Sequence, residues 1–401
     1  MIRGGRWPAT IVALGVAGVA ACTSATPSPT AVTVATPAAT VSPDIGSPSP
    51  AATPGLSTEM EVGRLDPELT DSIFEFASDG ESILFSSGFA EDAGRGASPD
   101  LWRYRVTADN SPEILWRNPN RDHAIVKIAG DLGTVAFVDI PRDGERAWKL
   151  WLIPRHEDEA ILLDSHPGDP DVSAFVPSFS IQESTIVWTA FDRGADGPVS
   201  QLLWAHAPDW EPAVLLERAS AAAELWFPSL SGSRVAFCEV VYSADRTTDT
   251  RTVYLLEPGS RPERLSHSDL ATMPLLVGDT VIWKEADPGF SMFNWGKLWQ
   301  SEVGGPGPHR LDIAPIEYVN YPSAGSRFVA WWSADAFTFG VYDLLEGRTR
   351  VIESYSSASQ ANVLRPHIAW DLLVWLYVEG EGDDSYAELR YARMPPIRSL
   401  P

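Results

Sequence analysis

Short apolar triplets that end in an aromatic residue recur along the chain, each inside a stretch where apolar and polar positions alternate. The seven triplets are Ile83-Leu84-Phe85, Val135-Ala136-Phe137, Ile186-Val187-Trp188, Val235-Ala236-Phe237, Val281-Ile282-Trp283, Val329-Ala330-Trp331 and Leu373-Val374-Trp375. Their aromatic residues, called anchors below, follow one another at intervals of 44 to 52 residues. A near-constant period of that size is typical of a repeat architecture.

Four strand-like runs fit into each period. The triplet forms the second run, and the third run carries an apolar residue followed by an aromatic one. Six copies of this pair are Leu101-Trp102, Leu150-Trp151, Leu203-Trp204, Val253-Tyr254, Leu298-Trp299 and Val341-Tyr342, whereas Arg390-Tyr391 keeps only the aromatic residue. The first run often has a proline nine residues before the anchor, as at Pro228, Pro274, Pro322 and Pro366. Because proline cannot donate a ladder hydrogen bond, we expect it to open this strand at an edge of the sheet.

Each repeat therefore predicts a four-stranded antiparallel sheet with two apolar faces, which only neighbouring copies can bury. Radial stacking of seven such sheets gives an all-β fold, a seven-bladed β-propeller. The 16 tryptophans suit this fold, because bulky rings fill the wedge between blades. The alternative is an antiparallel sandwich, for which seven copies are too many.

The last repeat lacks a fourth run, because the chain after Tyr391 continues into Pro395 and Pro396. The stretch 59–66 alternates like a strand, and its Arg64-Leu65-Asp66 repeats Arg310-Leu311-Asp312. We therefore expect this N-terminal stretch to close the ring as the outer strand of the last blade. The propeller is predicted over residues 58–395, followed by a short tail, 396–401.

The first 21 residues combine two arginines with an apolar segment, Ala9–Ala21, which is too short to span a bilayer and predicts a signal peptide. Val19-Ala20-Ala21-Cys22 resembles the lipobox of bacterial lipoproteins, which implies that Cys22 becomes the lipid-modified first residue. Ordinary cleavage after Ala21 is the alternative. Residues 22–57 consist mainly of Thr, Ser, Pro and Ala and predict a disordered tether. The expected location is the outer face of the cell membrane, periplasmic or extracellular.

The net charge of −24 argues against nucleic acid or anionic lipid as a partner, because phosphate binding requires clustered Lys and Arg. The membrane is expected to be contacted only through Cys22, and the propeller is expected to be a monomer. Cys238 is the only other cysteine, so a disulfide framework is excluded. Since Cys238 directly follows an anchor, we expect it to be a small buried hydrophobe.

One repeat carries a family resemblance. Residues 227–265, with Pro-Ser, a polar turn, Val-Ala-Phe, Val-Tyr-Leu and Arg-Leu, resemble the WD40-like repeats of periplasmic TolB-type propellers. Phe76-Ala77-Ser78-Asp79-Gly80 is similar to the Ser-Pro-Asp-Gly turn of those repeats, although other blades lack Asp-Gly there. The resemblance covers about 58–395 and implies the fold; in TolB-type proteins it would also imply periplasmic protein binding.

Acidic residues follow the anchors by two or four positions in six of the repeats. They are Asp139, Asp192, Glu239, Glu285, Asp287, Asp335 and Glu379. Even offsets keep these residues on the anchor's side of the pleat, so we infer a ring of carboxylates at the rim of one face. Such a ring could attract a basic partner or a divalent cation, and no other metal or cofactor site follows from the sequence. The alternative is that so acidic a protein places acids at strand ends without a functional reason.

Two functions stay open. The first is a non-enzymatic, membrane-tethered propeller that binds a protein or a cell-envelope ligand through its acidic face. The second is an enzyme, a hydrolase or lyase, that uses Asp139, Glu239 and Glu285 at the central channel as acid and base. The sequence has neither a Gly-x-Ser-x-Gly elbow nor a phosphate-binding glycine loop, which favours binding.

Overall fold

The computed structural model describes residues 60–65, 73–87, 100–107, 111–141, 147–168, 176–194, 197–218, 223–244, 247–287, 295–313, 316, 318–333, 338–354, 361–380 and 386–395. All strands described belong to the compact unit that begins at Glu61. None of these residues is helical, so the described part holds no helix that could cross a membrane.

The strands form seven four-stranded antiparallel sheets, numbered here as blades in chain order. Blade one consists of β2 (Ile73–Ser78), β3 (Ser82–Ser87), β4 (Leu101–Arg105) and β5 (Glu113–Trp116). Blade two consists of β6 (His123–Asp131), β7 (Thr134–Pro141), β8 (Trp148–Ile153) and β9 (Ile161–His166). Blade three consists of β10 (Phe179–Gln182), β11 (Thr185–Gly194), β12 (Gly197–His206) and β13 (Ala213–Arg218). Blade four consists of β14 (Ala223–Ser231), β15 (Arg234–Tyr242), β16 (Asp249–Leu256) and β17 (Glu263–Arg264). Blade five consists of β18 (Ala271–Val277), β19 (Thr280–Ala286), β20 (Gly296–Glu302) and β21 (His309–Arg310). Blade six consists of β22 (Asn320–Ala324), β23 (Phe328–Ser333), β24 (Thr338–Asp343) and β25 (Arg348–Ser354). Blade seven consists of β26 (Ala361–Ala369), β27 (Leu372–Glu379), β28 (Tyr386–Arg393) and β1 (Val62–Arg64).

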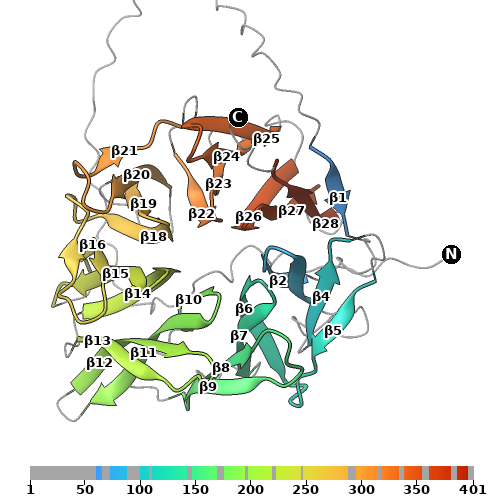
Figure 1. Cartoon of the computed structure of the whole chain (residues 1–401), viewed down its shortest axis with the longest axis horizontal. Coiled ribbons are helices and arrows are strands. Elements are labelled where there is room, and N and C mark those ends of the chain that lie inside the picture. Colours follow the sequence, from blue (N-terminus) through green and yellow to red (C-terminus); the bar gives the residue numbers. More distant parts are fainter. Residues whose placement is uncertain are drawn as a thin grey trace, which may run out of the picture. The chain divides into compact units, whose positions relative to one another are not determined.

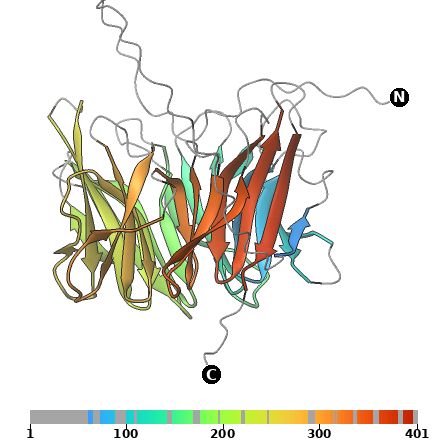
Figure 2. The ribbon, with the colours of Figure 1, turned by 90° about the horizontal axis from the view of Figure 1, so that it is seen from above.

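The seven sheets stand around a common middle, with β2, β6, β10, β14, β18, β22 and β26 innermost (Figure 1). Seen at a right angle to that view, the strands run side by side through the thickness of the ring (Figure 2). The predicted fold, a seven-bladed propeller of four-stranded antiparallel blades, is confirmed.

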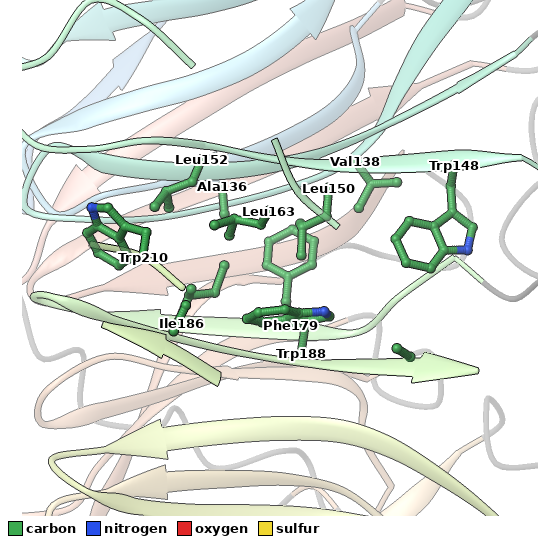
Figure 3. Close-up of a cluster of buried hydrophobic side chains, with 12 residues drawn as sticks. Ala136, Val138, Trp148, Leu150, Leu152, Leu163, Phe179, Ile186, Trp188 and Trp210 are labelled. Carbon is green, nitrogen blue, oxygen red and sulfur yellow. The ribbon is translucent and has the colours of Figure 1, made fainter. Parts of the chain in front are cut away.

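The seven anchors all lie on the second strand of their blade, and each has no exposed surface. The interface between blades two and three shows how an anchor is buried. Trp188 and Phe179 of blade three face Val138 and Leu150 of blade two in one apolar cluster (Figure 3). The anchors recur because each pair of neighbouring blades needs a large ring to fill the space between them.

The third strand of the last blade carries Arg390-Tyr391 in place of an apolar–aromatic pair. Trp375 is opposite Arg390 and Val374 is opposite Tyr391, which is the register that Leu203-Trp204 has in blade three. The guanidinium of Arg390 lies 3.6 Å from the ring centre of Tyr377. Arg390 thus takes the place of the apolar residue, and its planar cation stacks on an aromatic ring of the same blade.

The prolines nine residues before the anchors do not open the first strand, as the sequence suggested, but lie inside it. Pro228, Pro274, Pro322 and Pro366 each lie at a β-bulge of β14, β18, β22 or β26. At such a bulge two residues face one residue of the partner strand, so the missing N–H of proline costs no ladder hydrogen bond.

The predicted ring closure is confirmed. β1 pairs antiparallel with β28, with Gly63 opposite Tyr391. The N–H of Leu65 then donates to the carbonyl of Leu389 (3.0 Å), just as the N–H of Leu311 donates to the carbonyl of Leu298 (2.9 Å) in blade five. Both leucines are buried, at 1% and 2% exposed. The N-terminal stretch therefore repeats the outer strand of another blade in both pairing and burial.

Candidate functional site

Five of the predicted acids have side chains in the described part of the chain, each with a hydrogen-bond partner there, and Asp139 is the most buried of the five. It lies on β7 and is 1% exposed. Its Oδ1 accepts a hydrogen bond from Nδ2 of Asn118 (2.7 Å), and its Oδ2 lies 2.9 Å from Nδ1 of His123. Asn118 belongs to the connection from blade one to blade two, and His123 is the first residue of β6, where that connection ends. Asp139 therefore holds this connection in place.

Glu239 forms an ion pair between neighbouring blades. Its Oε1 lies 2.5 Å from Nε of Arg218, the last residue of the outer strand β13 of blade three. The Glu239 side chain is only 14% exposed. Its position thus couples blade four to the periphery of blade three.

Glu285, Glu379 and Asp287 accept hydrogen bonds from aromatic side chains. Nε1 of Trp283 donates to Glu285 (3.0 Å), and the hydroxyl of Tyr377 donates to Glu379 (2.8 Å). Both pairs are two residues apart on one strand, which agrees with the expected common side of the pleat. The hydroxyl of Tyr318 donates to Asp287 (2.7 Å), and this hydrogen bond raises the pKa of that tyrosine.

Two of the predicted acids are not covered in full. The backbone of Asp192 belongs to β11, but its side chain lies outside the described part of the chain, as does all of Asp335. Whether the seven acids act together as a ligand rim stays a prediction. Within the described ranges, no group of three or more His, Cys, Asp or Glu side chains could hold a metal ion.

A different set of residues lines the innermost strands. Each member stands ten residues before its anchor, and we call the set the inner level: Glu75, Lys127, Ser178, Phe227, Met273, Tyr321 and Arg365. In six of the seven innermost strands the residue lies at or directly after a β-bulge. Bulges change the direction of a side chain and are frequent beside functional sites.

Four consecutive blades repeat an unusual backbone conformation at the inner level. Phe227, Met273, Tyr321 and Arg365 have φ between 44° and 52° and are each followed by proline. Positive φ is uncommon for residues other than glycine and costs about 1–3 kcal/mol where the surroundings enforce it. Such strain occurs preferentially where a side chain has to be presented to a ligand.

Three charged residues occupy the inner level on blades seven, one and two, called the charged half below. Nη1 of Arg365 lies 2.7 Å from Oε2 of Glu75, although 290 residues separate them. Burial raises the pKa of Glu75, and the positive charges of Arg365 and Lys127 oppose that rise. Burial lowers the pKa of Lys127 to about 8, and the negative charge of Glu75 opposes that fall. The Lys127 ammonium also lies 5.4 Å from the ring centre of Phe179.

The opposite side of the inner level is apolar or aromatic. Phe227, Met273 and Tyr321, called the apolar half below, lie on β14, β18 and β22, and each is partly exposed. These strands follow one another around one side of the middle, while β26, β2 and β6 follow around the other (Figure 1). The inner level thus combines a charged half and an apolar half on facing strands.

Two further titratable groups lie too deep to meet a ligand. Lys284 is fully buried on β19, donates to Oδ1 of Asn320 (3.1 Å), and has a pKa lowered to about 7 by burial. The thiol of Cys238 is also fully buried, which raises its pKa to about 12. The buried position expected for Cys238 from the sequence is therefore correct.

The sequence contains a pattern that identifies the inner level, namely its spacing of ten residues before the anchor. The search for acids after the anchors did not reveal it. The residue before each of the four prolines is a member of it, and in the remaining blades the same spacing from the anchor finds the others. The spacing does not show the bulges, which change the direction of side chains and depend on how the strands pair.

Comparison with known proteins supports the fold. No protein-family model matches the sequence, and no curated protein matches it. Among solved structures, the chain is similar to the β-propeller domain of the Trilobed protease from Pyrococcus furiosus, with 10% identity over 83% of this chain and 99% of that chain and a TM-score of 0.57. It is also similar to oligogalacturonate lyase from Vibrio parahaemolyticus (11% identity, 85% and 95% covered, TM-score 0.52). A third similar structure is acylaminoacyl peptidase from Pyrococcus horikoshii (12% identity, 81% and 52% covered, TM-score 0.55). At these identities the likeness shows the propeller fold alone.

Proposed function

We propose that this protein is an exported propeller that binds a protein or cell-envelope ligand at its inner level. In this proposal a lipid on Cys22 and the tether 22–57 hold the propeller at the outer face of the cell membrane. The observation that carries the proposal is the inner level itself, where charged and apolar side chains stand ten residues before the anchor on six of the seven innermost strands. Ligand sites typically combine an apolar lining with a few polar groups.

Solvent exposure supports a binding role for these residues. The Arg365 side chain is 44% exposed and that of Glu75 is 18% exposed, although both lie on innermost strands. The acids after the anchors offer less to a partner, because the described ones already accept hydrogen bonds from groups such as Asn118, Arg218 and Trp283. The inner level is therefore favoured over the acidic rim as the contact surface.

Crosslinking and pull-down from detergent-solubilised membranes test the binding site. Phe227→Ala and Arg365→Gln should each abolish recovery of the partner that the unaltered chain recovers. Matched controls are Arg105→Gln, whose arginine is 59% exposed and pairs with Glu113, and Val214→Ala, which changes a valine 54% exposed on an outer strand. Loss of the partner only in a Glu239→Gln, Glu285→Gln, Asp287→Asn triple variant would place the contact at the acidic rim instead.

The membrane tether is tested separately. Cys22→Ala should abolish incorporation of radiolabelled fatty acid and move the protein from the membrane fraction to the soluble fraction. A variant that keeps its label and its membrane association would refute lipidation at Cys22.

A second candidate function is a propeller enzyme, a hydrolase or lyase. Its support is that burial moves the pKa values of Glu75 and Lys127 toward neutrality, which suits acid–base catalysis. Envelope sugars and lactones are the first substrates to assay, together with oligogalacturonate, which the name of the similar lyase suggests. Turnover that Lys127→Met and Glu75→Gln abolish, with unchanged melting temperatures, would favour this function over binding alone.

A further inference from the structure

We infer that the inner level binds a small organic monoanion, specifically a carboxylate that carries an apolar group. This inference rests on the proposed function and names the chemistry of its ligand. It follows from the charge, the hydrogen-bond donors and the apolar surface that the inner level brings together.

The charged half carries one positive charge in excess, since Arg365 and Lys127 stand against Glu75. The whole chain has a net charge of −24, so a local positive excess is contrary to its general character. The negative charge of Glu75 acts on both cations and forms a direct ion pair with Arg365. The remaining excess matches a single negative charge on the ligand, whereas a dianion such as phosphate would be repelled by Glu75.

The hydrogen-bond donors also suit a carboxylate. Arg365 contacts Glu75 through Nη1, and a guanidinium has five N–H groups in a planar fork. A carboxylate can accept two parallel hydrogen bonds from such a fork. Lys127 on β6, the innermost strand of the other neighbouring blade, supplies a second cation with three N–H donors.

The apolar half accounts for the rest of the ligand. Phe227, Met273 and Tyr321 are partly exposed and are presented by the strained backbone described above. Burying an apolar group against two aromatic rings and a methionine is favourable and does not depend on the shape of one particular ligand. A ligand with charge at one end and an apolar group at the other would therefore satisfy both halves.

The test uses three probes that share one apolar group and differ in charge. They are 3-phenylpropanoate, 3-phenylpropanol and 3-phenylpropylammonium, titrated into the purified full chain at pH 7 and followed by calorimetry. We expect the carboxylate to bind at least about 10-fold more tightly than the alcohol, because a hydrogen bond to a charged group is stronger than one to a neutral group. The ammonium probe should bind more weakly than the alcohol.

Variants then assign the contacts. Arg365→Gln and Lys127→Met should each weaken carboxylate binding about 10-fold and leave alcohol binding unchanged. Phe227→Ala should weaken both probes by a similar factor. Arg105→Gln, the exposed control, should change neither, and the melting temperature of every variant shows that it is folded.

Contradictory outcomes separate the ligand class from the proposed function. If the alcohol or the ammonium binds as tightly as the carboxylate and Phe227→Ala weakens it, the inner level is a ligand site but the anion inference is wrong. If no probe binds while partner recovery still depends on Phe227 and Arg365, the carboxylate inference fails and the proposed function stands. If neither probes nor partner depend on the inner level, both fail.

Discussion

Replacing Leu65 with alanine removes the buried side chain that directly follows the closing strand β1. Leu65 is 1% exposed and belongs to one apolar cluster with Phe76 and Phe85 of blade one and Val374 and Leu389 of blade seven. Removing a buried leucine side chain typically costs about 2–5 kcal/mol. We expect about 2–3 kcal/mol, because a strand held by three residue pairs can shift and fill part of the space.

Thermal and urea unfolding followed by tryptophan fluorescence measure this loss. The melting temperature should fall by about 5 °C, given about 2 °C per kcal/mol for a large domain. Leu311→Ala is the matched control, since Leu311 has the same backbone hydrogen bond and burial in blade five. Val62→Ala, which changes a residue 37% exposed on β1, should cost less than about 0.5 kcal/mol.

The comparison of the two leucines decides the question. If β1 closes the ring as the structure indicates, Leu65→Ala and Leu311→Ala should lower stability by similar amounts. If Leu65→Ala kept the wild-type melting temperature while Leu311→Ala lowered it, the reasoning would be refuted. That result would mean that the closing strand contributes nothing to the stability of the ring.

Three further predictions concern single groups. Gly80→Ala should lower the unfolding free energy by about 1–3 kcal/mol in urea, because Gly80 has φ of 91° and an added Cβ would lie 2.5 Å from Trp370. Gly232→Ala is the control and should cost less, because Gly232 has φ of 59° and an added Cβ would meet nothing within 4 Å. Equal losses for the two variants would contradict this explanation. Burial lowers the pKa of His367 from 6.5 to about 4, and its Nδ1 accepts the N–H of Ser78 (3.1 Å) across the ring closure. The unfolded chain therefore binds the proton first, so stability should fall as pH drops from about 6.5 to 4, and His367→Gln should remove that part of the pH dependence; an unchanged slope in urea titrations would count against it. The Cys238 thiol, fully buried with its pKa raised to about 12, should resist iodoacetamide at pH 8 in the folded protein and react in urea, as mass spectrometry would show; rapid labelling of the folded protein would contradict its burial.

The repeat and its period could be derived from the sequence because they depend on local patterns. An anchor such as Trp188 or Phe237 marks its strand wherever the blade stands in the ring, since the alternation around it is set by the pleat. Ring closure was also predictable, because Arg64-Leu65 repeats Arg310-Leu311 and the last repeat lacks an outer strand.

The candidate site was less accessible to the same reasoning. The spacing of two or four residues after an anchor identified Asp139 and Glu239 as acids near their anchors. It cannot show that Asn118 and Arg218 already donate hydrogen bonds to them. Those partners lie 21 residues earlier in both cases and belong to the preceding blade's end. Packing between blades, which no periodicity describes, determines which acids remain open to a ligand.

By itself, the amino-acid sequence determined the number of blades, the strand that carries each anchor and the segment that closes the ring. Each of these depends on residues that are close in the chain or that repeat at one spacing. Only the tertiary structure decided that the residues before the prolines lie at bulges of the innermost strands with positive φ, because pairing between strands determines where a bulge forms. It also decided that Arg365 meets Glu75, since closing the ring brings together strands that lie 290 residues apart in the chain.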